Sequence, residues 1–287
     1  MRITGRTRLA GIMGWPVAHS RSPALHNFWL DEQGVDGVYV PLAVRPEKLE
    51  TALRSLPALG FRGCNLTIPH KRAALSIVDR VDPLARRIGA MNTVVVMPDD
   101  SLEGSNTDVF GFRENMRDHV PDWKPAAGPA VVLGAGGAAR AVVAALIADG
   151  VTEIRLTNRT IARSEQVAAD LASPGCQLTI VSWDERAAAL YDAELLVNTT
   201  SLGMTGEPEL QIDITRLPPT AIVVDIVYVP LDTALLASAR RRGHRTVDGL
   251  GMLLHQGRPG FEAWFGTPAR VTRELRTAVL TTLANTR

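Results

Sequence analysis

The sequence predicts an α/β protein of two domains: an N-terminal open α/β domain and a second, doubly wound domain, with C-terminal helices that return to the first. Its 287 residues exceed the size at which one hydrophobic core usually keeps growing, and 46% hydrophobic residues can fill two cores. Short apolar runs alternate with helical patterns twice along the chain, which is typical of α/β domains. We therefore expect one domain at 1–104, completed by 249–287, and another at 105–248.

The first alternation lies between residue 8 and about residue 97. Its β-like runs are RLAGIM, GVYVPLAV, FRGCNLTI and NTVVVM. The segment SPALHNFWLDEQG predicts a helix with Ser22 at the N-cap, Pro23 at the first helical position and Gly34 at the end. Together these elements predict an open α/β sheet.

The second alternation begins after the loop VPDWKPAAGP. It reads as strand AVVLG, helix GAARAVVAALIADG, strand TEIRLTNR, helix TIARSEQVAADLAS, and strands near AELLVNTT and AIVVDIVY. This order predicts a parallel sheet with right-handed crossovers. A helical pattern over 107–118 joins the two alternations, and the tail from Leu250 returns to helix. We expect a ligand cleft between the domains, beneath the joining helix.

The charge balance argues against two classes of partner. Thirty-one basic and 30 acidic residues give a formal charge of +1, which removes the main electrostatic reason to expect nucleic acid or a membrane surface, so any basic site must be local. The most apolar run, AVVAALIA, is too short to span a bilayer, and we expect a cytoplasmic protein, either a monomer or a homodimer.

Cys64 and Cys176 form no ligand pattern, so we expect reduced thiols and no metal site.

The motif VVLGAGGAAR at 131–140 follows an apolar strand and opens a helix. Gly134 permits a tight turn, Gly136 lets the backbone approach a pyrophosphate, and Ala139 allows close packing of helix on strand. The helix N-terminus supplies N–H donors to the phosphates, with Gly137 and Ala138 in the same turn. A glycine pattern alone is weak evidence, but this context favours a Rossmann-type dinucleotide site.

The second strand of this domain indicates which dinucleotide binds. NAD-binding proteins usually carry an acidic residue there for the ribose 2′-hydroxyl, whereas this strand ends in Asn158, Arg159 and Thr160, with Arg163 one turn later. Two guanidinium groups without a carboxylate suit a 2′-phosphate, so we predict NADP. The alternative is that both arginines merely solvate a helix start.

Four polar clusters lie at strand ends or helix starts: HSRSP, NLTIPHK, AMNT and SNTD. Each alone is an ordinary cap or turn, but their joint occurrence predicts a small-molecule site. Lys71 and Asp108, if they converge, form a proton-transfer unit in which the lysine donates to an alkoxide and the carboxylate positions it. The alternative is an exposed ion pair of little energetic value.

These four clusters, with GAGGAAR, NRT and DGLGML, resemble the shikimate dehydrogenases in order and approximate spacing, from about Gly11 to Gln256. The resemblance implies reversible reduction of 3-dehydroshikimate to shikimate by NADPH, in aromatic amino-acid biosynthesis. It further implies that Lys71 and Asp108 form the catalytic pair, and that Gly249 belongs to the cofactor site.

The resemblance also assigns the substrate contacts by matching positions. Ser20 and Ser22 would hold the substrate carboxylate with Tyr228, while the hydroxyls and ring would contact Thr67, Asn92 and Gln256.

Two positions depart from the commonest family pattern. His70 stands where Phe or Tyr is frequent, and Ile226 stands where Met is common. We interpret His70 as a packing or surface residue rather than a proton donor, because the residue next to Lys71 at a helix start points elsewhere.

Three alternatives remain at this stage. A paralogue could act on quinate or on an amino analogue of shikimate, although the serine pair favours shikimate. A non-catalytic homologue could sense the metabolite, but such a protein should have lost Lys71 or Asp108. Another α/β dehydrogenase could act on a folate or an amino acid, which the Ser-Arg-Ser and Asn-Thr-Asp clusters disfavour.

Overall fold

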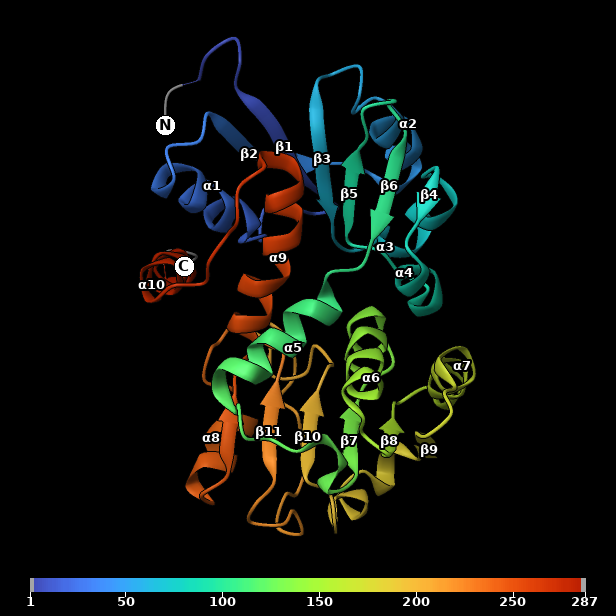
Figure 1. The fold of residues 1–287 in the computed structure, drawn as a ribbon. Coiled ribbons are helices and arrows are strands. Elements are labelled where there is room, and N and C mark those ends of the chain that lie inside the picture. Colours follow the sequence, from blue (N-terminus) through green and yellow to red (C-terminus); the bar gives the residue numbers. More distant parts are fainter. Residues whose placement is uncertain (1–2, 285–287) are drawn as a thin grey trace. The chain divides into compact units, whose positions relative to one another are not determined.

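The computed structural model describes residues 3–284 and divides the chain into two compact units. The first unit comprises Met1–Thr107 and Leu254–Arg287, and the second comprises Asp108–Leu253. Each contains one six-stranded sheet with helices packed on it (Figure 1). The α/β fold with two sheets confirms the predicted fold class.

The sheet of the first unit is mixed and has the order β2-β1-β3-β5-β6-β4. Its strands are β1 (Arg8–Gly14), β2 (Gly37–Ala43), β3 (Phe61–Leu66), β4 (Arg80–Val81), β5 (Thr93–Val96) and β6 (Leu102–Ser105). Strand β1 is parallel to β2 and β3, whereas β5 is antiparallel to both β3 and β6. The carboxyl ends of β1, β3 and β6 and the amino end of β5 therefore lie at one end of the sheet, and all four polar clusters lie at or follow these strand ends.

The helices of this unit include segments from both ends of the chain. They are α1 (Ser22–Glu32), α2 (Leu49–Arg54), α3 (His70–Ala73), α4 (Pro83–Ile88), α10 (Arg273–Ala284) and most of α9 (Gly249–Phe265). Helix α1 packs against α10 and β2, and the Trp29 indole donates to the Arg270 carbonyl at 2.8 Å (Figure 1). The C-terminal segment thus completes the first unit.

The start of α1 differs slightly from the prediction. Arg21, rather than Ser22, is the N-cap, and its side chain makes no capping hydrogen bond. The Ser22 N–H instead approaches the Ser20 hydroxyl oxygen, at 3.3 Å. Pro23 lies in the first turn as expected, because its missing N–H costs nothing there.

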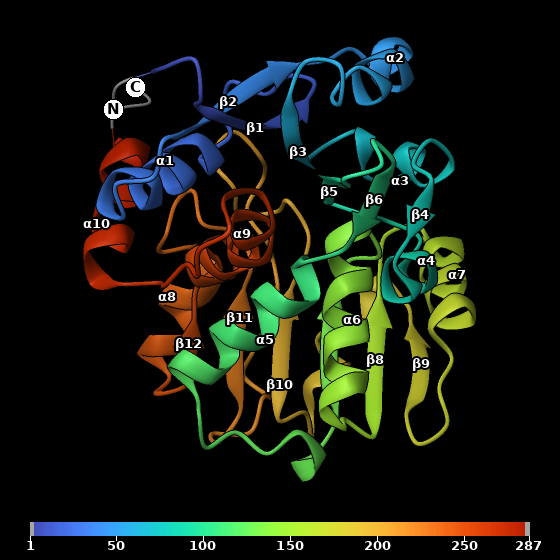
Figure 2. The same ribbon diagram turned by 45° about the horizontal axis from the view of Figure 1, so that its top comes forward.

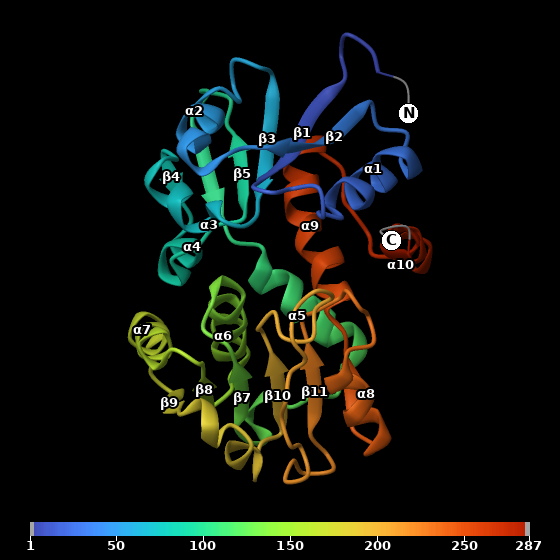
Figure 3. The ribbon, with the colours of Figure 1, turned by 180° about the vertical axis from the view of Figure 1, so that it is seen from behind.

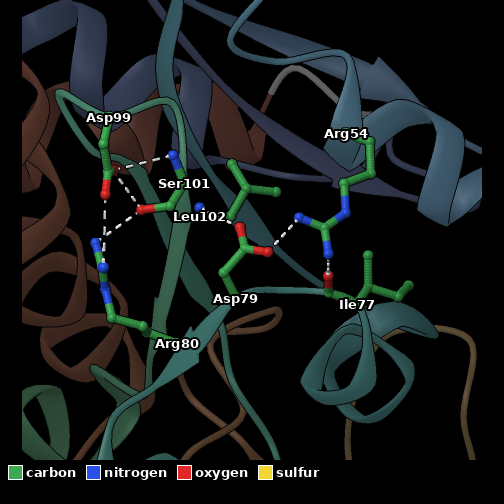
Figure 4. A network of polar contacts seen from close by, with 7 residues as sticks. All are labelled: Arg54, Ile77, Asp79, Arg80, Asp99, Ser101 and Leu102. Atoms are coloured by element: carbon green, nitrogen blue, oxygen red, sulfur yellow. Dashed lines mark hydrogen bonds and ion pairs between the residues drawn. The ribbon is translucent and has the colours of Figure 1, made fainter.

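A polar network ties the edge strands of this sheet to α2 (Figure 4). Asp79 accepts from Arg54 at 2.6 Å and from the Leu102 N–H at 2.7 Å, so its carboxylate joins α2 to β6. These hydrogen bonds, led by the one from the Leu102 N–H, lower the pKa of Asp79. Beside it, Arg80 donates to the Ser101 hydroxyl at 2.7 Å.

The sheet of the second unit is fully parallel and has the order β12-β11-β10-β7-β8-β9. Its strands are β7 (Ala130–Leu133), β8 (Glu153–Thr157), β9 (Gln177–Val181), β10 (Leu195–Asn198), β11 (Ile222–Asp225) and β12 (Arg245–Val247). Counted from the first strand of the unit, this order is 3-2-1-4-5-6 reversed, the Rossmann arrangement, and its switch point lies between β7 and β10.

Four helices of the second unit are α5 (Asp108–His119), α6 (Gly137–Asp149), α7 (Ile161–Leu171) and α8 (Ala234–Arg241). Helices α5 and α6 pack side by side in front of the sheet (Figure 2). The core strands β7, β10 and β11 are buried along their whole length, which explains their continuous apolar runs. Among the described residues, no helix is both long and apolar enough to cross a bilayer.

Candidate active site

The glycine turn after β7 has the geometry that its motif predicts. Gly134 has φ +110°, and a Cβ there would lie 2.7 Å from Thr199 Oγ1, so a larger residue would be strained and crowded. Its N–H donates to the Thr157 carbonyl on β8 at 2.8 Å. Ala139, one turn into α6, is fully buried against the sheet. The turn is thus held between β8 and the residue that follows β10.

The space above the next two glycines is open. A Cβ built on Gly136 or Gly137 would meet no atom within 4 Å, and Ala138 beside them is half-buried. Gly136 is the N-cap of α6, and no side chain caps this helix. The first N–H groups of α6 are thus available to an anion, which the helix dipole attracts. This cradle fits a pyrophosphate.

The end of β8 lies beside that cradle and carries positive charge. Arg159 and Arg163 are exposed, and neither makes an ion pair or a side-chain hydrogen bond within residues 3–284. Asn158 donates to the Thr160 carbonyl at 2.9 Å and so closes the turn into α7. Thr160 is the N-cap of α7 but makes no capping bond. Two unpaired guanidinium groups at a helix start suit a phosphate ligand.

Buried polar residues that the sequence analysis overlooked organise the loops after β10 and β11. Asp225 Oδ1 accepts from Asn198 Nδ2 and the Val227 N–H, each at 3.0 Å, and Oδ2 accepts from the Thr233 hydroxyl at 2.7 Å. Desolvation raises the pKa of Asp225 to about 6, although these hydrogen bonds oppose the rise. The apolar runs of β10 and β11 each end in a polar residue, Asn198 and Asp225, and this pattern in the sequence could have indicated the cluster.

These two loops leave the same edge of the sheet as the glycine turn (Figure 3), because the strands are parallel. Tyr228 is half-buried three residues beyond β11. A Cβ on Gly249 would lie 2.1 Å from the Ile226 carbonyl oxygen, so only glycine lets α9 begin against this loop. Gly249 therefore has a packing function, whatever it contributes to a cofactor.

In the first unit, the loops after β1 and β3 meet at the carboxyl edge of the sheet. The Thr67 N–H donates to the Met13 carbonyl at 3.0 Å, and the Trp15 N–H donates to the Ile68 carbonyl at 3.1 Å. Ser20 is half-buried and Ser22 buried, just beyond the first of these loops. The two serines lie close together through the Ser22 N–H contact to Ser20 described above.

Lys71 lies in the short helix α3, as predicted, and is half-buried. Its carbonyl accepts from the Met91 N–H at 2.8 Å, which ties α3 to the AMNT segment. His70 is buried, and its Nε2 lies 2.8 Å from the Val44 carbonyl oxygen. This contact confirms the packing interpretation of His70.

Two side-chain amides meet beside that segment. Asn92 is buried at the start of β5, Gln256 is half-buried in α9, and Asn92 Nδ2 donates to Gln256 Oε1 at 2.9 Å. In the first unit, the main chain of Lys71 is therefore tied to the segment of Asn92, whose amide pairs with Gln256 from a distant part of the sequence. Asp108 is buried at the first position of α5, in the second unit.

The strand order, the glycine turn and the uncapped helix α6 define a dinucleotide-binding protein with a separate α/β unit rich in polar groups at its strand ends. Residues 12–94 match the family model "Shikimate dehydrogenase substrate binding domain", and residues 120–230 match "Shikimate / quinate 5-dehydrogenase". A "Shikimate dehydrogenase (NADP(+))" from Paramagnetospirillum magneticum is 60% identical over 97% of this chain and 100% of its own. The chain belongs to the shikimate dehydrogenase family.

Solved structures show the same relationship. Shikimate 5-dehydrogenase from Thermus thermophilus, in complex with NADP(H) and shikimate, aligns with a TM-score of 0.84 and 36% identity, over 96% of this chain and 99% of its own. Quinate dehydrogenase from Corynebacterium glutamicum, in complex with NAD, aligns with a TM-score of 0.89 and 32% identity, over 96% and 99%.

Proposed function

We propose that this protein is an NADP-dependent shikimate dehydrogenase that reversibly reduces 3-dehydroshikimate to shikimate. The observation that carries the proposal is the Asn92–Gln256 amide pair in the first unit, beside a segment that a main-chain hydrogen bond ties to α3. The Lys71 main-chain carbonyl accepts from the Met91 N–H, one residue before Asn92, and Asn92 Nδ2 donates to Gln256 Oε1. An ammonium group and two amides suit a small polyhydroxylated acid.

The substrate contacts are part of this proposal. Ser20 and Ser22 hold the carboxylate, with Tyr228 as a third donor, because several neutral hydrogen bonds can replace its hydration. Thr67, Asn92 and Gln256 bond the ring hydroxyls. Support comes from the half-buried positions of Ser20 before α1, Thr67 after β3 and Gln256 within α9.

The second unit holds the cofactor in the same proposal. The first N–H groups of α6, at Gly136, Gly137 and Ala138, bind the pyrophosphate, and Arg159 and Arg163 bind the 2′-phosphate. Asn158, Thr160 and Gly249 shape the surrounding loops. When bound, NADPH supplies the hydride that adds to the carbonyl carbon.

Lys71 and Asp108 move the proton. In the reducing direction the Lys71 ammonium protonates the oxygen that becomes the alcohol, and the Asp108 carboxylate stabilises the ammonium form. In the oxidising direction neutral Lys71 accepts the hydroxyl proton. One hydride and one proton are transferred in each turnover, so atoms and charge balance.

Product identification tests the assigned activity. The purified protein is mixed with shikimate and NADP⁺, and 3-dehydroshikimate is quantified by chromatography alongside reduced cofactor. The proposal expects equal amounts of the two products. Reduced cofactor without 3-dehydroshikimate, or no product of either kind, would contradict it.

A further inference from the structure

The side-chain amide of Asn92 has its orientation fixed by the protein. The Thr107 backbone N–H approaches Asn92 Oδ1 at 2.8 Å. Because a backbone N–H can only donate, the atom it meets must be the amide oxygen. Asn92 Nδ2 is therefore the atom that faces Gln256 Oε1. Rotating the amide by half a turn would place two N–H groups against each other.

Two threonine hydroxyls reinforce this orientation. Thr107 Oγ1 and Thr93 Oγ1 lie 3.1 Å and 3.2 Å from Asn92 Oδ1, and 3.3 Å from each other. Each hydroxyl has one proton to donate. The two hydroxyls can use only one of these protons in a hydrogen bond to each other, so at least one hydroxyl donates to Asn92 Oδ1. The amide oxygen thus accepts a backbone donor and at least one hydroxyl, which leaves it poorly placed to accept from a ligand.

A second amide supports the cluster from the core. Asn65 Nδ2 donates to the Asn92 carbonyl at 3.0 Å and to Thr93 Oγ1 at 3.1 Å, and the Tyr39 hydroxyl donates to Asn65 Oδ1 at 2.6 Å. Tyr39, Asn65, Asn92, Thr93 and Thr107 are all buried. Within such a network each bond is stronger than in water, and a missing partner is costly.

We infer that Thr107 is a positioning residue for substrate binding, acting through Asn92. Its hydroxyl helps to hold the Asn92 amide with nitrogen toward Gln256, so that the pair offers N–H donors to a substrate oxygen. The inference rests on the proposed binding of shikimate by Asn92.

The test is a double-mutant cycle measured as the equilibrium dissociation constant of shikimate. Thr107→Val removes the hydroxyl at nearly constant volume, and Thr107→Ser is the matched variant that keeps it. Both changes are made in the wild-type chain and in Asn92→Ala, with titration calorimetry as the readout. Thermal unfolding and the NADP dissociation constant are recorded for every variant.

We expect Thr107→Val to weaken shikimate binding by about fivefold in the wild-type chain, the scale for one lost hydrogen bond, and Thr107→Ser to restore it. In the Asn92→Ala background, Thr107→Val should change binding by less than about twofold, because the partner is gone. NADP binding should stay constant throughout.

An equal effect in both backgrounds would overturn the inference, since Thr107 would then act through its neighbour Asp108 or through general stability. No effect in the wild-type chain would overturn it as well. Failure of the wild-type protein to bind shikimate would instead refute the proposed function, so the two failures are distinguishable.

Discussion

Asn92 and Gln256 are 164 positions apart, yet the Asn92 side chain donates to Gln256 Oε1 at 2.9 Å. The bond connects the residue before β5 to α9, a helix from the C-terminal part of the chain. It explains why the first unit needs its C-terminal segment for more than packing. The substrate site that we propose is incomplete without Gln256.

Removal of the Lys71 ammonium should abolish proton transfer and leave the fold intact. Lys71→Ala is expected to lower kcat by at least about a hundredfold, the scale for losing general acid catalysis. Arg72→Ala, a change at the adjacent exposed cation, is the matched control and should retain kcat. Steady-state kinetics and thermal unfolding provide the measurements. Near-wild-type turnover in Lys71→Ala would remove the assigned mechanism.

The choice of NADP over NAD is assigned to charge at the end of β8. Arg159→Ala should raise the KM for NADP far more than the KM for NAD, because only NADP carries the 2′-phosphate. Arg241→Ala, which alters an exposed arginine in the last turn of α8, should change neither value. Equal changes in both KM values for Arg159→Ala would refute this assignment.

The open space at the N-terminus of α6 gives a prediction that separates binding from folding. Gly136 has φ −86°, which alanine tolerates, and its Cβ would meet no atom within 4 Å. Gly136→Ala should therefore keep or slightly raise the unfolding temperature. The same methyl group would occupy the proposed phosphate cradle, so the NADP dissociation constant should rise at least about tenfold, about 1.4 kcal/mol. Unchanged NADP affinity would show that the phosphates bind elsewhere.

The buried carboxylate of Asp225 should make stability depend on pH. Its pKa rises from 3.8 to about 6 on folding, so the folded protein holds this proton more tightly than the unfolded chain. Its contribution to stability is present below about pH 4 and is lost as pH rises through about 6.

Asp225→Asn removes this titration at constant size. The free energy of unfolding of the variant, minus that of the wild type, should increase by up to about 3 kcal/mol between about pH 4 and about pH 7. Urea unfolding at several pH values measures this difference, in which other titrating groups cancel. A difference that stays constant with pH would contradict the assigned cause.

Much of the second unit could be predicted because its signals are local. The strand, glycine turn and helix around Gly134 lie within one short stretch, and the positive φ of Gly134 follows from sterics that the motif encodes. The basic end of β8 could be predicted for the same reason. The strands β4, β6, β9 and β12 were not predicted, because they are only partly buried and lack a continuous apolar run.

The hydrogen bonds that support the candidate site could not be predicted, because they join residues that are far apart in the sequence. Tyr39 and Asn65 come from different strands, and nothing in their local sequence shows that the Tyr39 hydroxyl reaches the Asn65 amide. His26 gave no signal either, although it is fully buried and stacks on Tyr39 with ring centroids 4.0 Å apart. Burial lowers the pKa of His26 to about 3, an effect that the neighbouring Asn65 side chain opposes only in part.

Shikimate and NADP are the substrate and cofactor that we assign to this protein together. The most direct measurement is kcat/KM for shikimate, quinate and aminoshikimate, each with NADP and with NAD. The account predicts the highest value for shikimate with NADP. A higher value for quinate, or for any substrate with NAD, would contradict it.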